Sequence, residues 1–261
     1  MNPRYLGVTT NSHCYIGCSF CPQPVFKRTY HGESYLTLEN FKLALGHTPR
    51  YVNIGFSGFS EPFLNPDCLS MIEYALQKGY HVDVASTLVG LKLKAVPRLA
   101  NCKLAGFVLH LPDNLGNAKI PITSEYQQVL TKVLTSIKVD QFVVMNERFT
   151  SNLRAGNLPD ARKIHKYGWF ICQSLVRPDC ILLPNCDVVL CCNDWGLKHV
   201  LGNLLEQDYE DIAYSEEFRK IASNRFRLNG KTLCRNCLYA SNPLKYFIRR
   251  TVLWGAKRIG G

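Results

Sequence analysis

The segment Tyr5–Cys21 reads YLGVTTNSHCYIGCSFC and joins a short apolar run to three closely spaced cysteines. Its first part, Tyr5–Thr10, is rich in residues that favour a β-strand, so the cysteines follow the carboxyl end of that strand. They form the pattern Cys-x-x-x-Cys-x-x-Cys at Cys14, Cys18 and Cys21. Three thiolates on one loop can hold three irons of a 4Fe–4S cluster and leave the fourth iron open, whereas structural zinc usually takes four ligands. The segment therefore predicts a strand that leads into an iron–sulfur site.

Outward from this segment, short β-type runs alternate with amphipathic helical patterns as far as about residue 170. The predicted strands are Tyr5–Thr10, Tyr51–Ser57, His81–Ser86, Leu104–Leu111 and Gln141–Asn146, and the predicted helices are Thr37–Leu45, Asp67–Lys78, Leu91–Ala100 and Ser124–Ile137. Such alternation is typical of parallel strands joined by helical crossovers. We expect an α/β fold with a partial (β/α)6 barrel over residues 1–168, and a doubly wound sheet is the alternative. In both folds the functional residues lie at the carboxyl ends of the strands.

The composition places the chain among soluble globular proteins with metal sites. It has 261 residues, a formal net charge of +11 and 12 cysteines. Apart from Cys68 and Cys102 the cysteines fall in groups, which favours metal sites over a disulfide framework. No apolar run approaches the ~18 residues of a membrane span, and the start of the chain lacks the pattern of a secretory signal. We therefore predict a cytoplasmic protein whose positive charge suits an anionic substrate.

The first cysteine pattern resembles the signature of the radical S-adenosylmethionine (SAM) superfamily, in both spacing and position. The resemblance implies a 4Fe–4S cluster on Cys14, Cys18 and Cys21 whose open iron binds SAM. One-electron cleavage of SAM then gives a 5′-deoxyadenosyl radical that abstracts a substrate hydrogen. A flavodoxin- or ferredoxin-type protein would donate that electron. Phe20 matches an aromatic side chain that lies near the adenine in this family.

Two further segments are similar to the SAM-binding parts of the superfamily. Gly58-Phe59-Ser60-Glu61-Pro62 resembles its Gly-Gly-Glu-Pro segment, although Phe59 and Ser60 stand where glycines are usual. Ser86-Thr87 ends the third predicted strand and loosely matches a Thr-Asn-Gly segment. The resemblance implies that five residues bind SAM, namely Gly58, Ser60, Glu61, Ser86 and Thr87. A turn that starts a helix and a simple strand-end cap are the alternatives.

The later cysteines resemble the auxiliary-cluster domains of the same superfamily, known as SPASM and twitch domains. We expect this domain at residues 169–240, where Ile181–Leu183 and Val188–Leu190 predict a β-hairpin and Leu201–Leu204 matches a Leu-Gly-Asn motif. The resemblance implies one auxiliary 4Fe–4S cluster that passes electrons, with the ligands Cys172, Cys191, Cys234 and Cys237. Alternative ligands are Cys180, Cys192 and Cys186, the last of which stands at a turn position usually filled by Gly. A structural zinc ribbon is the alternative for the whole group.

Two residues outside the cluster ligands are candidate catalytic residues. Arg154 begins an Arg-Ala-Gly-Asn segment that resembles a loop of SPASM and twitch enzymes, where a matching Arg lies at the substrate. Cys192 is a candidate hydrogen-atom donor to a substrate radical. A solvent-exposed loop Arg and an inert packed thiol are the alternatives. For Asp194 and His110 we expect structural roles, as a hairpin cap and a strand histidine.

By size and cluster layout the chain is similar to the scyllo-inosamine dehydrogenases. The resemblance implies an oxidoreductase that takes hydrogen from the carbinol carbon of a polyol, amino sugar or nucleotide sugar and leaves a ketone, with the auxiliary cluster as electron acceptor. A radical epimerase with a Cys hydrogen donor and a peptide-modifying radical enzyme are the enzymatic alternatives. The alternative without catalysis is a zinc-stabilised nucleic-acid-binding protein, which the positive charge and the Cys-x-x-Cys pair would suit.

Residues 241–261 form a basic tail with apolar side chains between its Lys and Arg residues. Such a tail could lie on a membrane surface or bind RNA. More often its apolar stripe packs on the domain and its charges face water. We expect packing, and neither nucleic acid nor membrane as a partner.

Overall fold

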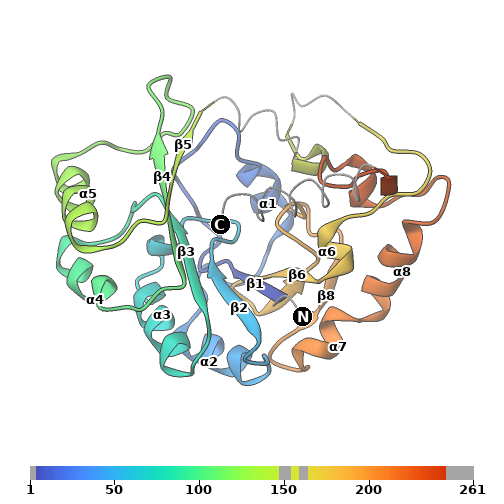
Figure 1. Cartoon of the computed structure of the whole chain (residues 1–261), viewed down its shortest axis with the longest axis horizontal. Helices are drawn as coiled ribbons and strands as arrows, with labels where there is room; N and C mark the ends of the chain where they lie inside the picture. Colours follow the sequence, from blue (N-terminus) through green and yellow to red (C-terminus); the bar gives the residue numbers. More distant parts are fainter. Residues whose placement is uncertain (1–3, 147–153, 159–163, 245–261) are drawn as a thin grey trace, which may run out of the picture.

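The computed structural model describes residues 4–146, 154–158 and 164–244 and shows one eight-stranded sheet in them (Figure 1). The strands are β1 (Arg4–Val8), β2 (Val52–Phe56), β3 (Val82–Ser86), β4 (Gly106–Pro112), β5 (Gln141–Met145), β6 (Asp179–Leu182), β7 (Asp187–Val189) and β8 (Val200–Asn203). Their spatial order is β5-β4-β3-β2-β1-β6-β7-β8. The strands from β5 to β6 pair in parallel, and β7 and β8 continue the sheet antiparallel. The five predicted strands and the predicted hairpin are therefore present.

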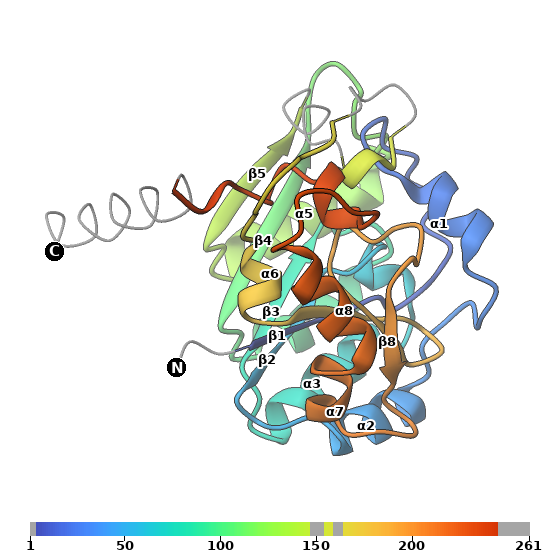
Figure 2. The ribbon, with the colours of Figure 1, turned by 90° about the vertical axis from the view of Figure 1, so that its right-hand side faces the viewer.

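Helices cover the outer side of the curved sheet, and two further helices lie beside its last strand, β8 (Figures 1 and 2). They are α1 (Gln23–Thr29), α2 (Leu38–Gly46), α3 (Cys68–Gln77), α4 (Val96–Ala100), α5 (Ser124–Ser136), α6 (Gln173–Val176), α7 (Tyr209–Ala213) and α8 (Glu216–Asn224). Thr37 and Thr123 begin α2 and α5 by accepting the backbone N–H of Asn40 and Tyr126 on their hydroxyls. None of the described helices is long and apolar enough to cross a membrane.

The sheet remains open, which confirms the predicted α/β fold with a partial barrel. Its sixth parallel strand lies beside β1 and not beside β5, with Tyr5 opposite Asp179 and Val8 opposite Leu182. Because β6 is also the first strand of the hairpin with β7, the hairpin region and the N-terminal strands share one sheet. The predicted boundary near residue 168 stays a prediction, and the predicted tail falls mostly outside the described residues.

Two apolar clusters hold these layers together. The larger one fills the space between the sheet and its outer helices, and fully buried side chains such as Leu6, Ile54 and Phe107 belong to it. Each such side chain contributes roughly 1.5–3 kcal/mol relative to an exposed one. In the smaller cluster Phe59 stacks near Trp195, with ring centroids 4.5 Å apart, and Phe26 of α1 lies 5.3 Å from Phe59. This cluster joins the loop after β2 to the segment after β7, so Trp195 serves in packing.

Candidate active site and cluster-binding cysteines

The first three cysteines lie on one loop that leaves the carboxyl end of β1. The Cys21 N–H donates to the Cys18 carbonyl at 3.1 Å, and the backbone turns at Gly17 with a φ of 71°. Burial and the neighbouring Cys14 thiol raise the pKa of Cys18 to about 11 and the pKa of Cys21 to about 12. Groups whose pKa values respond to one another lie close together. The three cysteines therefore lie near one another on this loop, and their role as ligands of one cluster stays a prediction.

A cavity of about 420 Å³ opens beside this loop. All three cysteines line it, together with Lys27 and Arg28 of α1 and with Asn157. Its volume lies in the range of pockets that hold small ligands and cofactors. The two cations give the cavity a positive wall, which suits a carboxylate or another anionic group.

Glu61 links the ends of β2 and β3 with its buried carboxylate. It accepts hydrogen bonds from the Ser86 hydroxyl at 2.6 Å and from both the backbone N–H and the hydroxyl of Thr87 at 2.7 Å. Burial raises the pKa of Glu61, although these bonds act in the opposite direction. The structure thus brings three of the residues predicted to bind SAM into a single network, in which they contact one another.

Polar atoms beside this network have no hydrogen-bond partner among the described residues. The buried Ser60 hydroxyl is one, and the Asn11 amide oxygen at the end of β1 is another. The Asn11 side-chain nitrogen donates to the Glu61 backbone carbonyl at 2.9 Å. Because Ser60 directly precedes Glu61, the Ser60 hydroxyl and the Asn11 amide oxygen lie at the same edge of the sheet. Unpaired buried polar atoms of this kind are expected to meet a ligand or ordered water. The segment after β2 therefore fits a cofactor with polar groups beside the cysteine loop, whereas Phe20 is buried in the main core.

Gly58 has a packing role that the structure makes testable. A Cβ atom at Gly58 would lie 2.2 Å from the Thr9 hydroxyl and 2.6 Å from the Thr9 nitrogen. We expect Gly58→Ala to lower the free energy of unfolding by about 2–3 kcal/mol, because β1 and the loop after β2 would have to separate. At Gly46 nothing lies within 4 Å of an added Cβ. Gly46→Ala is the matched control and should raise stability by up to about 1 kcal/mol in urea unfolding curves, and equal losses in both variants would contradict the close packing.

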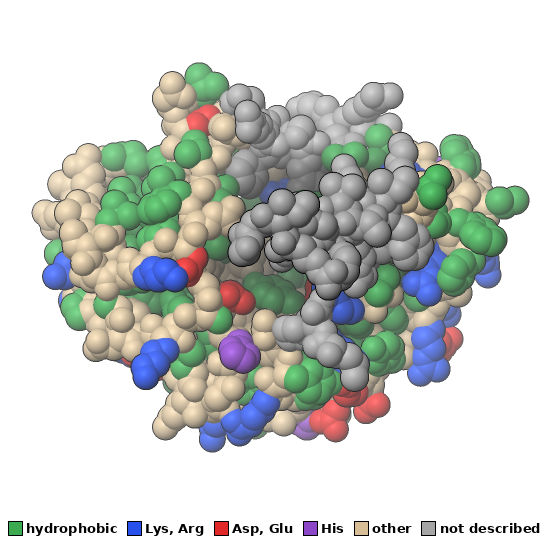
Figure 3. Space-filling view, viewed as in Figure 1, with side chains coloured by type: hydrophobic (Ala, Val, Ile, Leu, Met, Phe, Trp, Pro, Cys, Tyr) green, Lys and Arg blue, Asp and Glu red, His purple; other side chains and the backbone are tan. Residues whose placement is uncertain are grey.

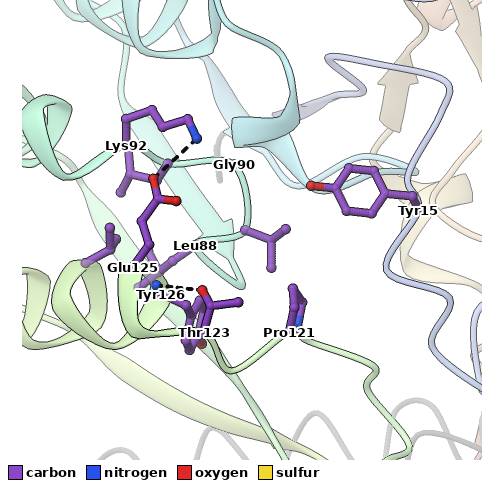
Figure 4. A pocket seen from close by; sticks show the side chains of 11 residues that line it. Tyr15, Leu88, Gly90, Lys92, Pro121, Thr123, Glu125 and Tyr126 are labelled. Atoms are coloured by element: carbon purple, nitrogen blue, oxygen red, sulfur yellow. Dashed lines mark hydrogen bonds and ion pairs between the residues drawn. The ribbon is translucent and has the colours of Figure 1, made fainter.

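A second cavity of about 150 Å³ lies behind the end of β3 (Figure 4). Tyr15 of the cysteine loop faces it from one side, and residues 88–92 and the start of α5 close the other. The Lys92–Glu125 ion pair at 3.3 Å and the Thr123 cap of α5 stand at its edge. Since the cavity is smaller than most ligand pockets, we assign the site to the larger cavity beside the cysteines.

Four of the later cysteines influence one another electrostatically. Burial is the first cause that raises the pKa of Cys234, and Cys172 and Cys237 raise it further. Burial also raises the pKa of Cys191, to which Cys192 and, to a smaller extent, Cys234 add. By contrast Cys180 is packed with Tyr209 and Asp179. Cys172, Cys191, Cys192, Cys234 and Cys237 therefore lie in one region, in which Cys191 packs with Cys237, whereas the rival Cys180 lies elsewhere. The choice of auxiliary ligands among them stays a prediction.

Cys186 is also separate from this group, because it forms the turn between β6 and β7. Its φ of 66° is the left-handed conformation that glycine adopts most readily, as its place in the motif predicts. Its thiol lies near Asn40, and Glu33 and Asp187 are its charged neighbours. Asn203 fastens this turn by donating to the Asn185 carbonyl at 3.1 Å and to Asp187 at 2.9 Å. The Leu-Gly-Asn motif therefore stabilises the hairpin.

Arg235, between the last two cysteines, organises the region around them. Its guanidinium is fully buried and donates to the carbonyls of Lys166, Gly168, Asn224 and Arg227 at 2.6–3.1 Å. It also lies over the Phe170 ring, 5.1 Å from the centroid. The pattern Cys-x-x-Cys gives no reason to single out either inner residue, so sequence reasoning missed Arg235.

Arg154 lies between the two groups of cysteines. Its neighbour Ala155 packs with Cys237 and Cys191, and Asn157 lines the cavity beside the first three cysteines. The positive charge of Arg154 opposes the rise in pKa that burial causes at Cys21 and Cys192, and it adds to the lowering that burial causes at His110. Three successive residues, Arg154 to Gly156, have positive φ values of 41°, 54° and 84°. This tight turn buries Ala155 against Leu233 and Cys237. The packing of Ala155 fixes the backbone position of the adjacent Arg154.

Asn157 and Asn193 extend this junction between the two halves. The Asn157 side chain donates to the carbonyls of Arg154 at 2.7 Å and Asn193 at 3.0 Å. The buried Asn193 amide oxygen has no partner among the described residues and is available to a ligand. Sequence reasoning missed Asn193, and its only available signal was its place directly after Cys191-Cys192.

The remaining candidates have distinct surroundings. Cys192 has an exposed surface, yet burial among protein atoms is the main cause that raises its pKa. Asp194 accepts the backbone N–H groups of Lys198 at 2.9 Å and His199 at 2.8 Å, which is the turn-capping role expected for it. Burial is the first cause that lowers the pKa of His110.

A single metal ion is the alternative to a cluster at each group of cysteines. Among the described residues, no group of three or more His, Cys, Asp or Glu side chains is placed to hold one metal ion. A 4Fe–4S cluster takes its thiolates on separate irons, so its ligands stand further apart than those of one ion. Three and four thiols fit the donor sets of an open and a closed 4Fe–4S cluster, respectively.

Comparisons with known proteins agree with this arrangement. Residues 172–238 match the SPASM model, described as an iron–sulfur cluster-binding domain. BtrN in complex with AdoMet and 2-DOIA has a TM-score of 0.64 and 18% identity, over 92% of this chain and 93% of BtrN. SuiB of Streptococcus suis bound to the precursor peptide SuiA has a TM-score of 0.56 and 15% identity, over 90% of this chain and 69% of SuiB. For anSMEcpe with bound AdoMet the TM-score is 0.55 and the identity 12%, over 91% of this chain and 84% of anSMEcpe.

A comparison with curated proteins gave no match. The structural neighbours have the radical SAM fold, and the open sheet of this chain agrees with it. The chain therefore has the fold of the radical SAM enzymes and carries, at residues 172–238, a SPASM-type iron–sulfur cluster-binding domain.

Proposed function

We propose that this protein is a radical SAM oxidoreductase that converts a secondary alcohol of a polyol, amino sugar or nucleotide sugar into a ketone. One observation carries the proposal, which is the place of Arg154 between the two groups of cysteines. A substrate bound at Arg154 would have the radical source on one side and an electron acceptor on the other. BtrN, whose structure contains AdoMet and 2-DOIA, is a radical SAM dehydrogenase of the same fold.

In this proposal, separate groups of residues would bind the two clusters and SAM. Cys14, Cys18 and Cys21 would hold a 4Fe–4S cluster, which supplies the electron that cleaves SAM to the 5′-deoxyadenosyl radical. Cys172, Cys191, Cys234 and Cys237 would hold a second 4Fe–4S cluster, which supplies an acceptor for the electron of the oxidised substrate. Ser60 and Asn11 offer polar atoms to SAM at the end of the sheet.

Arg154 and its neighbours would bind the substrate. The guanidinium has donors that suit a hydroxyl, a carboxylate or a phosphate, and the Asn193 amide oxygen is an acceptor in the same region. His110, whose pKa burial lowers, is kept neutral near Arg154 and can accept the proton of the alcohol as it becomes a carbonyl.

Anaerobic turnover tests this proposal. The reconstituted protein, a chemical reductant and SAM are mixed with single polyols, amino sugars or nucleotide sugars, and ketone, 5′-deoxyadenosine and methionine are measured by mass spectrometry. We expect one ketone per 5′-deoxyadenosine with one class of alcohol, and Arg154→Gln should abolish the ketone while iron content stays unchanged. The absence of ketone from every alcohol class would overturn the proposal.

A radical epimerase is the second candidate, and the exposed surface of the Cys192 side chain favours it, because a hydrogen-atom donor must be accessible to the substrate. In deuterium oxide an epimerase incorporates one deuterium at the inverted carbon and forms no ketone. Cys192→Ala would abolish that reaction and leave alcohol oxidation intact. The third candidate, a peptide-modifying enzyme, is favoured by the fold shared with SuiB, whose structure contains a precursor peptide. It predicts that only peptides give products.

A further inference from the structure

Two neighbouring cations of α1 face the cavity beside the first cysteine loop. Lys27 and Arg28 line this cavity, and both side chains are exposed. Neither forms an ion pair with a side chain in the part of the chain that the structure describes. No described Asp or Glu lines the cavity either. Two adjacent cations without a counter-ion suit a ligand group that carries more than one negative charge.

The net charge of the chain does not by itself select this cavity. The formal charge is +11, and Lys and Arg side chains are spread over the face of the molecule shown in Figure 3. At the second cavity a carboxylate accompanies the cation, in the Lys92–Glu125 ion pair. Near the cysteine loop the carboxylates have other partners, because Asp113 accepts the backbone and side-chain N–H groups of Asn117 at 2.9 and 2.6 Å and Asp194 caps its own turn. The cations of α1 therefore remain available to a ligand.

Further cations lie close to two other segments of the cavity wall. A Cβ atom on Gly17, which lines the cavity, would lie 3.8 Å from the Cδ atom of Lys119. A Cβ atom on Gly196 would lie 3.9 Å from the Cε atom of Lys198 and 3.5 Å from the side-chain oxygen of Asn157, which also lines the cavity. Cations on several sides of one cavity raise its positive potential and attract anionic ligands.

The cavity extends from α1 toward the turn that carries Arg154. Asn157 lines the cavity, and its side chain donates to the Arg154 carbonyl at 2.7 Å. Burial raises the pKa of Cys14, and the charge of Lys27 opposes this rise, as Arg154 does at Cys21. A substrate bound at Arg154 therefore lies beside the same cysteine loop as Lys27.

The wall of the cavity also holds a buried hydrogen-bond acceptor. Gln23 lines the cavity and is only 6% exposed. Its side-chain nitrogen donates to the Ser12 carbonyl at 3.2 Å, whereas its side-chain oxygen is buried without a partner among the described residues. Such an acceptor is expected to meet ordered water or a donor of a ligand, for example a hydroxyl group. The cations and this acceptor together suit an anion that carries hydroxyl groups.

From these observations we propose that the substrate is a phosphorylated sugar, whose phosphate binds Lys27 and Arg28 and whose hydroxyl groups reach Gln23. The inference rests on the proposed alcohol oxidation and narrows its substrate class. A sugar monophosphate and the diphosphate of a nucleotide sugar each carry about two negative charges at neutral pH, which matches the two cations. The ammonium group of a free amino sugar would be repelled by these cations, and a neutral polyol would leave them without a counter-ion.

Binding of inorganic pyrophosphate and of uridine diphosphate to the reconstituted full-length protein tests the phosphate site by isothermal titration calorimetry. Lys27→Gln/Arg28→Gln removes both charges of the site, and Lys94→Gln/Lys132→Gln removes two exposed charges near α4 and α5 as the matched control. We expect the first variant to weaken binding of both probes about tenfold or more, and the second to change it by less than about twofold. Equal affinities for the two probes would indicate a sugar monophosphate, and tighter binding of uridine diphosphate would indicate a nucleotide sugar.

Three outcomes would overturn the phosphate site. The first is that neither probe binds, or that both double variants have an equal effect. The second is that Lys27→Gln/Arg28→Gln loses iron or SAM binding to the same extent as probe binding, which would assign the two cations to the cofactors. The third is that gluconate, a sugar carboxylate, binds through these cations while both phosphate probes do not.

The alcohol assay separates the phosphate site from the proposed reaction. A ketone from neutral polyols or free amino sugars alone would remove the phosphate site and leave the alcohol oxidation in place. Phosphate binding that depends on Lys27 and Arg28, without a ketone from any class of alcohol, would remove the alcohol oxidation alone.

Discussion

Replacing Cys14, Cys18 and Cys21 together by Ala is expected to lower the iron content of the reconstituted protein from about eight to about four atoms per chain. The three cysteines lie on one loop and line one cavity, and Cys14 raises the pKa of the other two, so we expect them to act as one ligand set. We expect the remaining four irons on Cys172, Cys191, Cys234 and Cys237, which the substitution does not touch. Cleavage of SAM should disappear with the first cluster. Iron and sulfide assays after anaerobic reconstitution, with 5′-deoxyadenosine measured in parallel, provide the test.

Cys102→Ala is the matched control for this experiment. Cys102 is isolated from both groups, and its thiol donates to the Arg98 carbonyl of the same turn. This variant should keep about eight irons, and Cys180→Ala and Cys186→Ala should do the same because both residues lie apart from the four auxiliary ligands. Stoichiometric zinc without iron in the wild-type protein would contradict both cluster assignments and favour the nucleic-acid-binding alternative.

Arg235→Ala is expected to destabilise the C-terminal part of the chain by about 4 kcal/mol. The substitution leaves four backbone carbonyls without their buried donor and opens a cavity beside Phe170. For a chain of this size such a loss lowers the melting temperature by roughly 10 °C. The reconstituted variant should retain about four irons on the first cysteine loop and lose those of the auxiliary group. Calorimetry and iron analysis measure the two effects independently.

Two further variants separate the contacts of Arg235 from its charge. Arg235→Lys keeps the charge, but an ammonium cannot reach four carbonyls that a planar guanidinium spans, so most of the loss should remain. The exposed side chain of Arg227 takes no part in this network, and Arg227→Ala should change stability by less than about 0.5 kcal/mol. An Arg235→Ala protein as stable as Arg227→Ala would show that the buried network does not hold the domain.

Much of the architecture could be predicted because it depends on local patterns. The five N-terminal strands follow their apolar runs, and the turn at Cys186 has the left-handed backbone that its place in the motif predicts. Helix α1 was missed because Pro22 and Pro24 interrupt any helical periodicity, although proline in the first turn of a helix is itself a start signal. The position of β6 beside β1 was missed because periodicity identifies strands without giving their order in the sheet.

In the candidate site, too, contacts between residues close in sequence could be predicted, whereas contacts between distant residues could not. The spacing of Cys14, Cys18 and Cys21 places them on one loop, so their proximity could be predicted. The hydrogen bonds from Ser86 and Thr87 to Glu61 connect residues 25 and 26 positions apart, and no local pattern contains them. Arg235 was missed for a related reason, because its four acceptors are backbone carbonyls, which every residue possesses.

Strand β6 belongs at once to the parallel sheet and to the hairpin that begins the SPASM-type domain. A domain that is attached only through a linker can be exchanged between proteins without disturbing the rest of the fold. Here the exchange would break the backbone hydrogen bonds between β1 and β6 in the middle of the sheet. A chimaera made near residue 168 should therefore fail unless the donor also supplies a strand that fits beside β1. The same continuity makes the separation between the two groups of cysteines a property of the sheet, so the distance between them is fixed by backbone pairing.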